Sequence, residues 1–142
     1  MSEFLIAIHA LVYLGHRNEP LTSEELAENI CVNPVRVRTV LKAFIEKGIV
    51  KTKRGQSGGY VLHNKLSEIN LAEIAQILNY DLIHNNWYTG DEEACCQISA
   101  GIQGYVRGLI ALINIDIQNL LKKITLQDVE TSILKRDCHE TL

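Results

Sequence analysis

Residues 33–62, NPVRVRTVLKAFIEKGIVKTKRGQSGGYVL, decide the fold because they join a well-delimited helix to a glycine-rich turn. Asn33 is a preferred N-cap residue, Pro34 fits the first helical position, and Gly48 can end a helix in a left-handed conformation. This stretch therefore predicts a helix over residues 34–47.

The predicted helix has two chemically different faces when it is drawn at about 100° per residue. Its apolar positions share one face: Val37, Val40, Leu41 and Phe44. Its small and basic positions lie on the opposite face and its flank: Val35, Arg36, Arg38, Thr39 and Lys42. One side is therefore expected to pack on a core and the other to present cations outward.

A β-hairpin is expected directly after this helix. The runs IVKTKR and GYVL favour strands, and they flank the tetrapeptide GQSG, so residues 49–62 are predicted to form the hairpin. Glycines permit a tight, exposed turn with positive backbone dihedrals. The cations of the first strand, among them Lys53, are then held where a phosphate backbone could run.

Basic residues are concentrated in this part of a chain whose formal net charge is −3. Residues 34–65 contain a single carboxylate, Glu46, and eight cations: Arg36, Arg38, Lys42, Lys47, Lys51, Lys53, Arg54 and Lys65. Such an excess on an acidic chain indicates a face that binds a polyanion. The alternative is a charged face that meets only solvent.

Two more helices are expected before this stretch. Apolar spacing predicts one over residues 4–14. Thr22 and Glu25 form a capping-box sequence that starts another, which ends near Ile30. This second helix, a tight turn and the helix over residues 34–47 make a helix-turn-helix.

The remaining helices follow the hairpin. Asn70 and Glu73 repeat the capping-box signal and predict a helix over residues 70–79. Apolar periodicity then predicts a long helix over residues 98–124, whose apolar arc is broader than one small domain buries. A separate face collects small residues: Gly101, Gly104, Gly108 and Ala111. We expect a homodimer through this helix, with an internal core helix of a monomer as the alternative. A short final helix is expected around Leu126, Val129 and Ile133.

Residues 80–97 lose periodicity and are expected to form a loop. Trp87 and Tyr88 either cover the long helix or line a small-molecule pocket. Cys95 and Cys96 are either small buried hydrophobes or thiols whose anion is stabilised at a helix N-terminus. Of the other cysteines, Cys31 is expected in the core, and Cys138 is expected to be exposed and free to pair between subunits.

Several function classes are disfavoured. The four cysteines have no zinc-ligand spacing, the histidines form no metal pair, and no catalytic triad or phosphate loop is present, so an enzyme or a metal site is not expected. The most apolar stretch, residues 98–117, is interrupted by Arg107 and Asp116, and the N-terminus lacks a basic leader, so we expect a cytoplasmic protein without a membrane span.

The chain resembles the Rrf2 family of bacterial winged-helix regulators over nearly its whole length. The resemblance rests on TSEELAENI before the predicted recognition helix, KGIV after it, RGQSGGYVL as the wing, and EINLAEI before a cysteine-bearing loop and a long helix. It implies a mainly α fold with a small β-hairpin: a winged helix-turn-helix domain plus a long C-terminal dimerisation helix. It divides the chain into DNA-binding residues 1–79, a sensor loop at 80–97 and dimerisation helices at 98–142.

The resemblance also implies where double-stranded DNA would bind. The helix over residues 34–47 would enter the major groove of a near-palindromic operator through Val35, Arg36, Arg38, Thr39 and Lys42. The wing would reach the minor groove through Lys53, Arg54, Gln56, Ser57 and Gly58. Members that hold an iron-sulfur cluster have three spaced cysteines where this chain has only adjacent Cys95 and Cys96. We therefore expect no cluster and no other cofactor, and the alternative is a cluster completed by non-cysteine ligands such as His84 or Glu92. Cys96 is the better sensor candidate.

The sequence thus predicts a homodimeric transcription regulator, a repressor that responds to an oxidant, a thiol signal or a small molecule. The alternative is a winged-helix protein-interaction module that does not bind DNA and docks a partner through the long helix and acidic loop.

Overall fold

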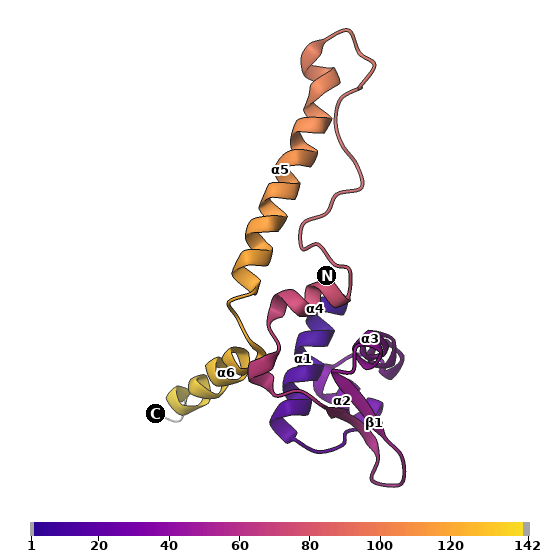
Figure 1. Cartoon of the computed structure of the whole chain (residues 1–142), viewed down its shortest axis with the longest axis vertical. Coiled ribbons are helices and arrows are strands. Elements are labelled where there is room, and N and C mark those ends of the chain that lie inside the picture. Colours follow the sequence, from indigo (N-terminus) through magenta and orange to yellow (C-terminus); the bar gives the residue numbers. More distant parts are fainter. Residues whose placement is uncertain (1, 141–142) are drawn as a thin grey trace. The chain divides into compact units, whose positions relative to one another are not determined.

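A computed structural model describes residues 2–140, and the side chains of residues 2–135. The chain forms two compact units, one of residues 1–80 with 121–142 and one of residues 81–120. The elements of the first unit are α1 (Ser2–Arg17), α2 (Ser23–Ile30), α3 (Pro34–Glu46), β1 (Val50–Lys53), β2 (Gly59–Leu62), a 3-10 turn η1 (Leu66–Glu68), α4 (Leu71–Ile77) and α6 (Leu126–Glu140). The long helix α5 (Gln97–Leu121) makes up most of the second (Figure 1).

Helix starts in the first unit follow the predicted caps. The Thr22 hydroxyl accepts the N–H of Glu25 at 3.1 Å, and the Glu25 carboxylate accepts the N–H of Thr22 at 2.8 Å. Asn70 and Glu73 form the same reciprocal pair at the start of α4. Asn33 caps α3 by accepting the Val35 N–H at 2.8 Å. These side chains bond N–H groups that a helix start leaves without a partner.

The core of the first unit is built around α1. Its buried side chains are Phe4, Ile6, Ala7, Ala10, Leu11 and Leu14. Helices α2, α3, α4 and α6 and strand β2 all contact α1. The apolar face of α3 is buried as predicted, because Val37, Val40, Leu41 and Phe44 are at most 3% exposed. Burial of this face fixes which side of α3 meets solvent.

The hairpin pairs in register from Val50 with Leu62 to Lys53 with Gly59. It is tied to the segment before α2, because Leu21 and Tyr60 exchange two backbone hydrogen bonds of 3.0 and 2.7 Å. Gly59 makes this approach possible. A Cβ atom there would lie 2.5 Å from the Leu21 carbonyl oxygen, and its φ is 151°. The wing is therefore anchored to the helix-turn-helix.

The final helix differs from the sequence prediction. It is 15 residues long, so the expectation of a short helix is wrong. It belongs with the first compact unit, where it contacts α1 and η1 and buries Leu126 completely. Backbone hydrogen bonds of 2.9 Å join Leu71 to Ile124 and Leu126 to Ile69. The unit boundaries thus differ from the predicted division at residues 79 and 97, because these long-range pairs bring the C-terminal segment back to α1.

In the second unit, the loop over residues 81–96 runs along α5 and is fastened to it at several points. The Asn114 side chain accepts the N–H of Ile83 at 3.1 Å and donates to its carbonyl oxygen at 2.7 Å. The Arg107 guanidinium lies 4.5 Å from the centre of the Tyr88 ring. The N–H of Asp91 meets the carbonyl and hydroxyl oxygens of Ser99, each at 3.1 Å. The segment lacks regular structure, as predicted, but these contacts hold it against α5.

Helix α5 is long and apolar enough, by length and composition, to cross a membrane, with a mean hydropathy of 1.3 over its best window. This differs from the expectation that Arg107 and Asp116 interrupt the stretch too strongly. The observation is weak support for a span, because a soluble protein's helix that packs on a partner has the same composition.

We predict that Gly59→Ala lowers the free energy of unfolding of the first unit by about 1–3 kcal/mol, because both the left-handed strain and the clash with Leu21 must be relieved. Gly55→Ala is the matched control, since its φ is also positive, at 113°, but nothing lies within 4 Å of the added atom. It should cost distinctly less. Urea unfolding followed by circular dichroism measures both, and equal losses would contradict the anchoring role of Gly59.

Candidate nucleic-acid interface

The outward face of α3 contains the side chains predicted to meet DNA. The apolar positions of the opposite face are buried, as described above. All five predicted residues of the outward face are exposed: Val35, Arg36, Arg38, Thr39 and Lys42. The Thr39 hydroxyl donates to the Val35 carbonyl oxygen at 2.9 Å, so this side chain is already bonded to its own helix. A helix with this division can pack on its own core while it inserts its other side into a groove.

Arg38 differs from its neighbours because it is already engaged. Its guanidinium donates to the Ser23 hydroxyl at 2.9 Å and lies 3.6 Å from the Glu24 carboxylate. Ser23 is buried and is the first residue of α2, so this contact joins α2 to α3. Ser23 and Arg38 also lower the pKa of Glu24, after the larger effect of its own backbone N–H. Arg38 therefore sets the geometry of the helix-turn-helix as well as adding charge.

The hairpin turn presents the remaining predicted contacts. Lys53, Arg54, Gln56 and Ser57 are exposed. Gly58 is half-buried, and a Cβ atom there would lie 2.1 Å from the Lys53 carbonyl oxygen. Its N–H closes the turn on the Gly55 carbonyl oxygen at 3.0 Å. Gly58 shapes the turn, and the side chains around it are available to a ligand.

The cations of this unit are largely free of carboxylates. Among the residues that the structure describes, Arg38 is the one cation within 34–65 that forms an ion pair. Arg36 interacts electrostatically with Glu3 at the start of α1 and helps to lower the pKa of that carboxyl, after stronger effects of hydrogen bonds and the chain terminus. The charges of Lys42, Lys53 and Arg54 are therefore not balanced by an ion pair in the described chain, and they are available to a negatively charged partner.

The cysteines of the second unit do not behave as buried hydrophobes. Cys95 and Cys96 are both exposed, which contradicts that alternative for the single chain. Cys96 immediately precedes α5, and the backbone N–H groups of Ser99 and then Ile98 lower the pKa of its thiol. These donors stabilise the thiolate, which is the reactive form of cysteine.

The two adjacent aromatic residues of the loop, Trp87 and Tyr88, differ in their exposure to solvent. Trp87 is 71% exposed, whereas Tyr88 is half-buried beneath the Arg107 guanidinium. Together with Gln103 and Val106 they line a pocket of about 130 Å³. Ligand sites for drug-sized molecules are usually about 300–1,000 Å³, so this one is small.

One cysteine prediction is wrong. Cys31 is exposed, not in the core, because it follows the last turn of α2 in a left-handed conformation with φ of 65°. Its N–H bonds to the Ala27 carbonyl oxygen at 2.8 Å, which ends the helix and turns the side chain outward. Cys138 lies outside the side chains that the structure describes.

Sequence reasoning missed the residues that hold the interface together. Ser23 and Glu24 were visible only as part of a helix start, and Leu21 only as an apolar residue before it. Their bonds to Arg38 and Tyr60 join positions 15 and 39 residues apart in the chain. The one signal in the sequence is Ser23, because a serine hydroxyl at the start of a helix can accept a hydrogen bond from a side chain of a neighbouring helix.

A helix-turn-helix with an exposed basic second helix and an anchored hairpin defines a winged-helix protein of the DNA-binding class. The family model described as "Rrf2: Iron-dependent Transcriptional regulator" matches residues 1–131. The chain belongs to the Rrf2 family, and the resemblance inferred from its wing and recognition helix is confirmed.

Solved structures agree with this fold. A transcriptional regulator from Lactobacillus plantarum has a TM-score of 0.76 at 24% identity, covering 97% of each chain. IscR of T. potens has a TM-score of 0.71 at 18% identity, covering 94% of this chain and 86% of its own. CymR, the global cysteine regulator of B. subtilis, has a TM-score of 0.67 at 16% identity, covering 93% and 95%. At these identities the likeness establishes the winged-helix fold, as predicted.

A sequence relative, named as the HTH-type transcriptional regulator YffB of Lactococcus lactis, is 23% identical over 70 residues. The match covers 48% of this chain and 45% of that protein, so this chain matches about half the length of its curated relative. This relative and the first of the solved structures above are named as transcriptional regulators.

We predict that Arg38→Ala lowers the free energy of unfolding by about 0.5–1.5 kcal/mol, because it removes the hydrogen bond to buried Ser23. Lys42→Ala, which lies one turn further along the same exposed face, should change stability by less than about 0.5 kcal/mol. Urea unfolding of both variants distinguishes the two roles. Equal stabilities would mean that the contact with Ser23 does not hold the two helices in solution.

Proposed function

We propose that this chain is a homodimeric, sequence-specific transcription repressor of the cytoplasm that releases DNA when a thiol in its sensor loop is oxidised. Helix α3 enters the major groove through Val35, Arg36, Arg38, Thr39 and Lys42. The hairpin turn follows the backbone or the minor groove beside it.

The single observation that carries DNA binding is the anchoring of two cationic elements within one compact unit. The bond from Arg38 to Ser23 fixes α3 against α2, and the bridge from Leu21 to Tyr60 fixes the hairpin to the same segment. The free cations therefore have a defined spacing instead of lying on independent loops. Phosphate contacts position such a unit, and contacts to base edges supply specificity.

The homodimer is supported by α5. In the described chain only Leu121 of this helix is buried, and seven large apolar side chains are exposed along it. Monomeric soluble proteins rarely leave so extended an apolar surface open. Two copies would place two reading units on one near-palindromic site, as a two-fold axis requires.

DNA binding is tested with Lys42→Ala and Arg54→Ala on a fragment identified by genomic selection. Roughly half a dozen phosphate contacts per dimer make log K fall by about 0.9 per contact per log unit of salt. Each variant removes one contact per subunit, so the salt slope should become shallower by about 1.8 in a dimer. Fluorescence anisotropy over a salt series measures this change.

Lys135→Ala on α6 is the control and should leave the slope unchanged, since its exposed charge lies outside the proposed interface. Failure of the unaltered protein to bind any genomic fragment even at about 50 mM salt, where phosphate contacts are strong, would overturn this function. That result would instead support the protein-interaction module.

The signal is assigned to Cys96 on geometric grounds. Its exposed thiol stands before α5, where two backbone N–H groups stabilise the thiolate. Peroxide transfers one oxygen to this thiolate, forming sulfenic acid and releasing the rest as hydroxide. The change occurs in the loop that Asn114 and Arg107 fasten to α5. A small-molecule effector at Trp87 is less favoured because that pocket is small.

Iron is not needed for this switch. Within the described residues, no three His, Cys, Asp or Glu side chains are grouped to hold a metal ion. Cys95 and Cys96 are adjacent in sequence at a helix start, whereas clusters are held by several separated thiolates. The donor set of one chain does not fit a cluster, and we propose regulation without one.

We predict that peroxide lowers DNA affinity and that Cys96→Ser abolishes this response while Cys95→Ser retains it. Because the pKa of Cys96 is lowered in the folded chain, its alkylation should stay fast to a lower pH than in the urea-unfolded chain. Mass spectrometry of the peptide after timed iodoacetamide treatment gives both pH profiles. Coincident profiles, or a peroxide response that survives in Cys96→Ser, would remove Cys96 from the mechanism.

A further inference from the structure

A network of three side chains links the start of α2 to the outward face of α3. The Arg38 nitrogen Nη1 donates to the Ser23 hydroxyl at 2.9 Å and lies 3.6 Å from the Glu24 oxygen Oε1. The Ser23 hydroxyl in turn donates to the other Glu24 oxygen, Oε2, at 3.1 Å. Because a hydroxyl can accept one hydrogen bond while it donates another, the three side chains form one continuous network.

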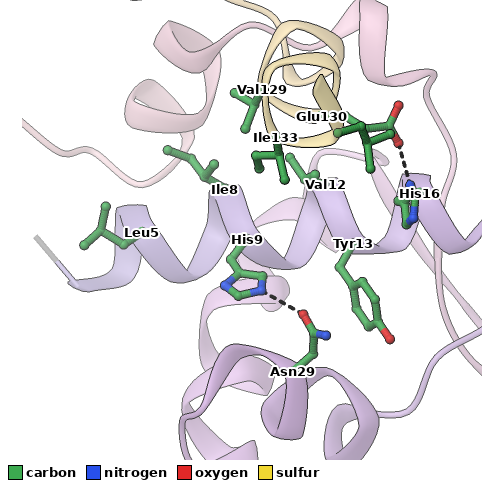
Figure 2. Close-up of a pocket in the computed structure, with 11 residues that line it drawn as sticks. Leu5, Ile8, His9, Val12, Tyr13, His16, Asn29, Val129, Glu130 and Ile133 are labelled. Carbon is green, nitrogen blue, oxygen red and sulfur yellow. Dashed lines mark hydrogen bonds and ion pairs between the residues drawn. The ribbon is translucent and has the colours of Figure 1, made fainter. Parts of the chain in front are cut away.

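The helix that supports Arg38 is itself fixed to the core. Ser23 is 7% exposed, so the packing around it holds its hydroxyl in place. The far end of α2 is tied to α1, because the His9 nitrogen Nε2 lies 2.8 Å from the Asn29 oxygen Oδ1, a link that Figure 2 shows. Arg38 is therefore held by a support that cannot easily move with it.

Most of the Arg38 guanidinium remains available to a ligand. In the part of the chain that the structure describes, its contacts are made by Nη1, which leaves Nε and Nη2 as donors. The side chain is 47% exposed on the outward face of α3. In the major groove, guanine offers two acceptors, N7 and O6, that match two N–H groups of one arginine. A phosphate offers acceptor oxygens as well, so a further group must decide between the two.

The Glu24 carboxylate is placed to make this decision. Its side chain is 70% exposed and lies beside the same guanidinium. The pKa of Glu24 is lowered by its own backbone N–H, by Ser23 and by Arg38, in that order, so the carboxylate is charged at neutral pH. A phosphate that approached Arg38 would be repelled by this charge, whereas the acceptors of guanine belong to a base without net charge. Glu24 therefore favours a base edge over the DNA backbone as the partner of Arg38.

We propose that Glu24 sets operator specificity by positioning Arg38, together with Ser23, to read a guanine in the major groove of each half-site. This inference rests on the proposed function and names the base that the operator must offer to this side chain. Arg38 contacts the base, and Ser23 and Glu24 are positioning residues. Without the charge of Glu24, Arg38 would be free to bind phosphate, so the protein would gain affinity for unrelated DNA while it lost discrimination.

Glu24→Gln tests this role because it removes the charge and keeps the shape of the side chain. Selection from a random duplex library by the unaltered full chain should yield a guanine at one position of each half-site. Arg38→Ala should abolish the preference at that position alone. Replacing this G·C pair by A·T in one half-site should weaken binding of the unaltered chain by about 5–150-fold, the range that a bidentate pair of arginine and guanine supplies.

In Glu24→Gln, the penalty for the A·T replacement should be smaller by at least about threefold, because Arg38 can then turn to phosphate. The affinity for an unrelated duplex should rise in the same variant. Fluorescence anisotropy on the selected, the replaced and the unrelated duplexes measures all three affinities. A purely structural role of Glu24 would lower all three affinities and leave their ratios unchanged.

Glu28→Gln is the matched control. Glu28 is also exposed and lies one turn further along the same face of α2, but the ion pair of Arg38 is formed with Glu24. The control removes the same charge from the chain and should leave the penalty unchanged. Urea unfolding should give the same midpoint for both glutamine variants as for the unaltered chain, because both side chains are exposed.

Three results would overturn the positioning role of Glu24. They are an unchanged penalty in Glu24→Gln, an equal reduction of the penalty in Glu28→Gln, and a selected site whose guanine is absent or is still preferred by Arg38→Ala. In each of these cases the unaltered chain still binds a selected site, so the proposed function stands. An unaltered chain that enriches no sequence would overturn the proposed function together with this inference.

Discussion

The burial of one face of α3 against α1 is the constraint on which the rest of this structure depends. Val37, Leu41 and Phe44 are fully buried, so rotation of α3 about its axis would expose apolar surface at about 25 cal/mol per Å². Because that face is fixed, Arg36 and Lys42 must face solvent. Core packing therefore sets the direction of these side chains, whereas their positive charge is not required by the packing.

Orientation alone does not give a reading surface, because α2, α3 and the hairpin must also be held relative to one another. The hydrogen bond from Arg38 to Ser23 joins α3 to α2, and the backbone hydrogen bonds between Leu21 and Tyr60 join the hairpin to the segment before α2. An Arg that joins two helices is held in a narrower range of rotamers than a free one, so it loses less entropy when DNA approaches. Structural and recognition roles can therefore coexist in one side chain.

The sequence was informative where the physics is local. Capping boxes at Thr22 and Asn70 involve residues three apart, and each was predicted with the correct partner. The faces of α3 followed from its period. What could not be predicted depends on contacts between distant positions: the return of α6 to α1, and the fastening of Ile83 by Asn114. The exposure of Cys31 follows from its left-handed backbone, a conformation that helix ends usually assign to Gly or Asn, so the sequence does not indicate it. The site residues were predicted as a set, but which of them was already bonded was not.

Helix α5 is the least self-sufficient element of the chain. Its three glycines each cost about 1 kcal/mol relative to alanine, and each large apolar side chain left in water forgoes about 1.5–3 kcal/mol of burial. In the described chain, contacts with the loop at Ile83, Tyr88 and Asp91 help to stabilise this helix. A partner that binds α5 would therefore stabilise α5 and its loop together. Because such coupling is reciprocal, a change that destabilises the loop would also weaken binding of the partner. In the proposed homodimer, a chemical change at Cys96, which lies between the loop and α5, would therefore weaken the dimer without altering the proposed DNA-binding surface.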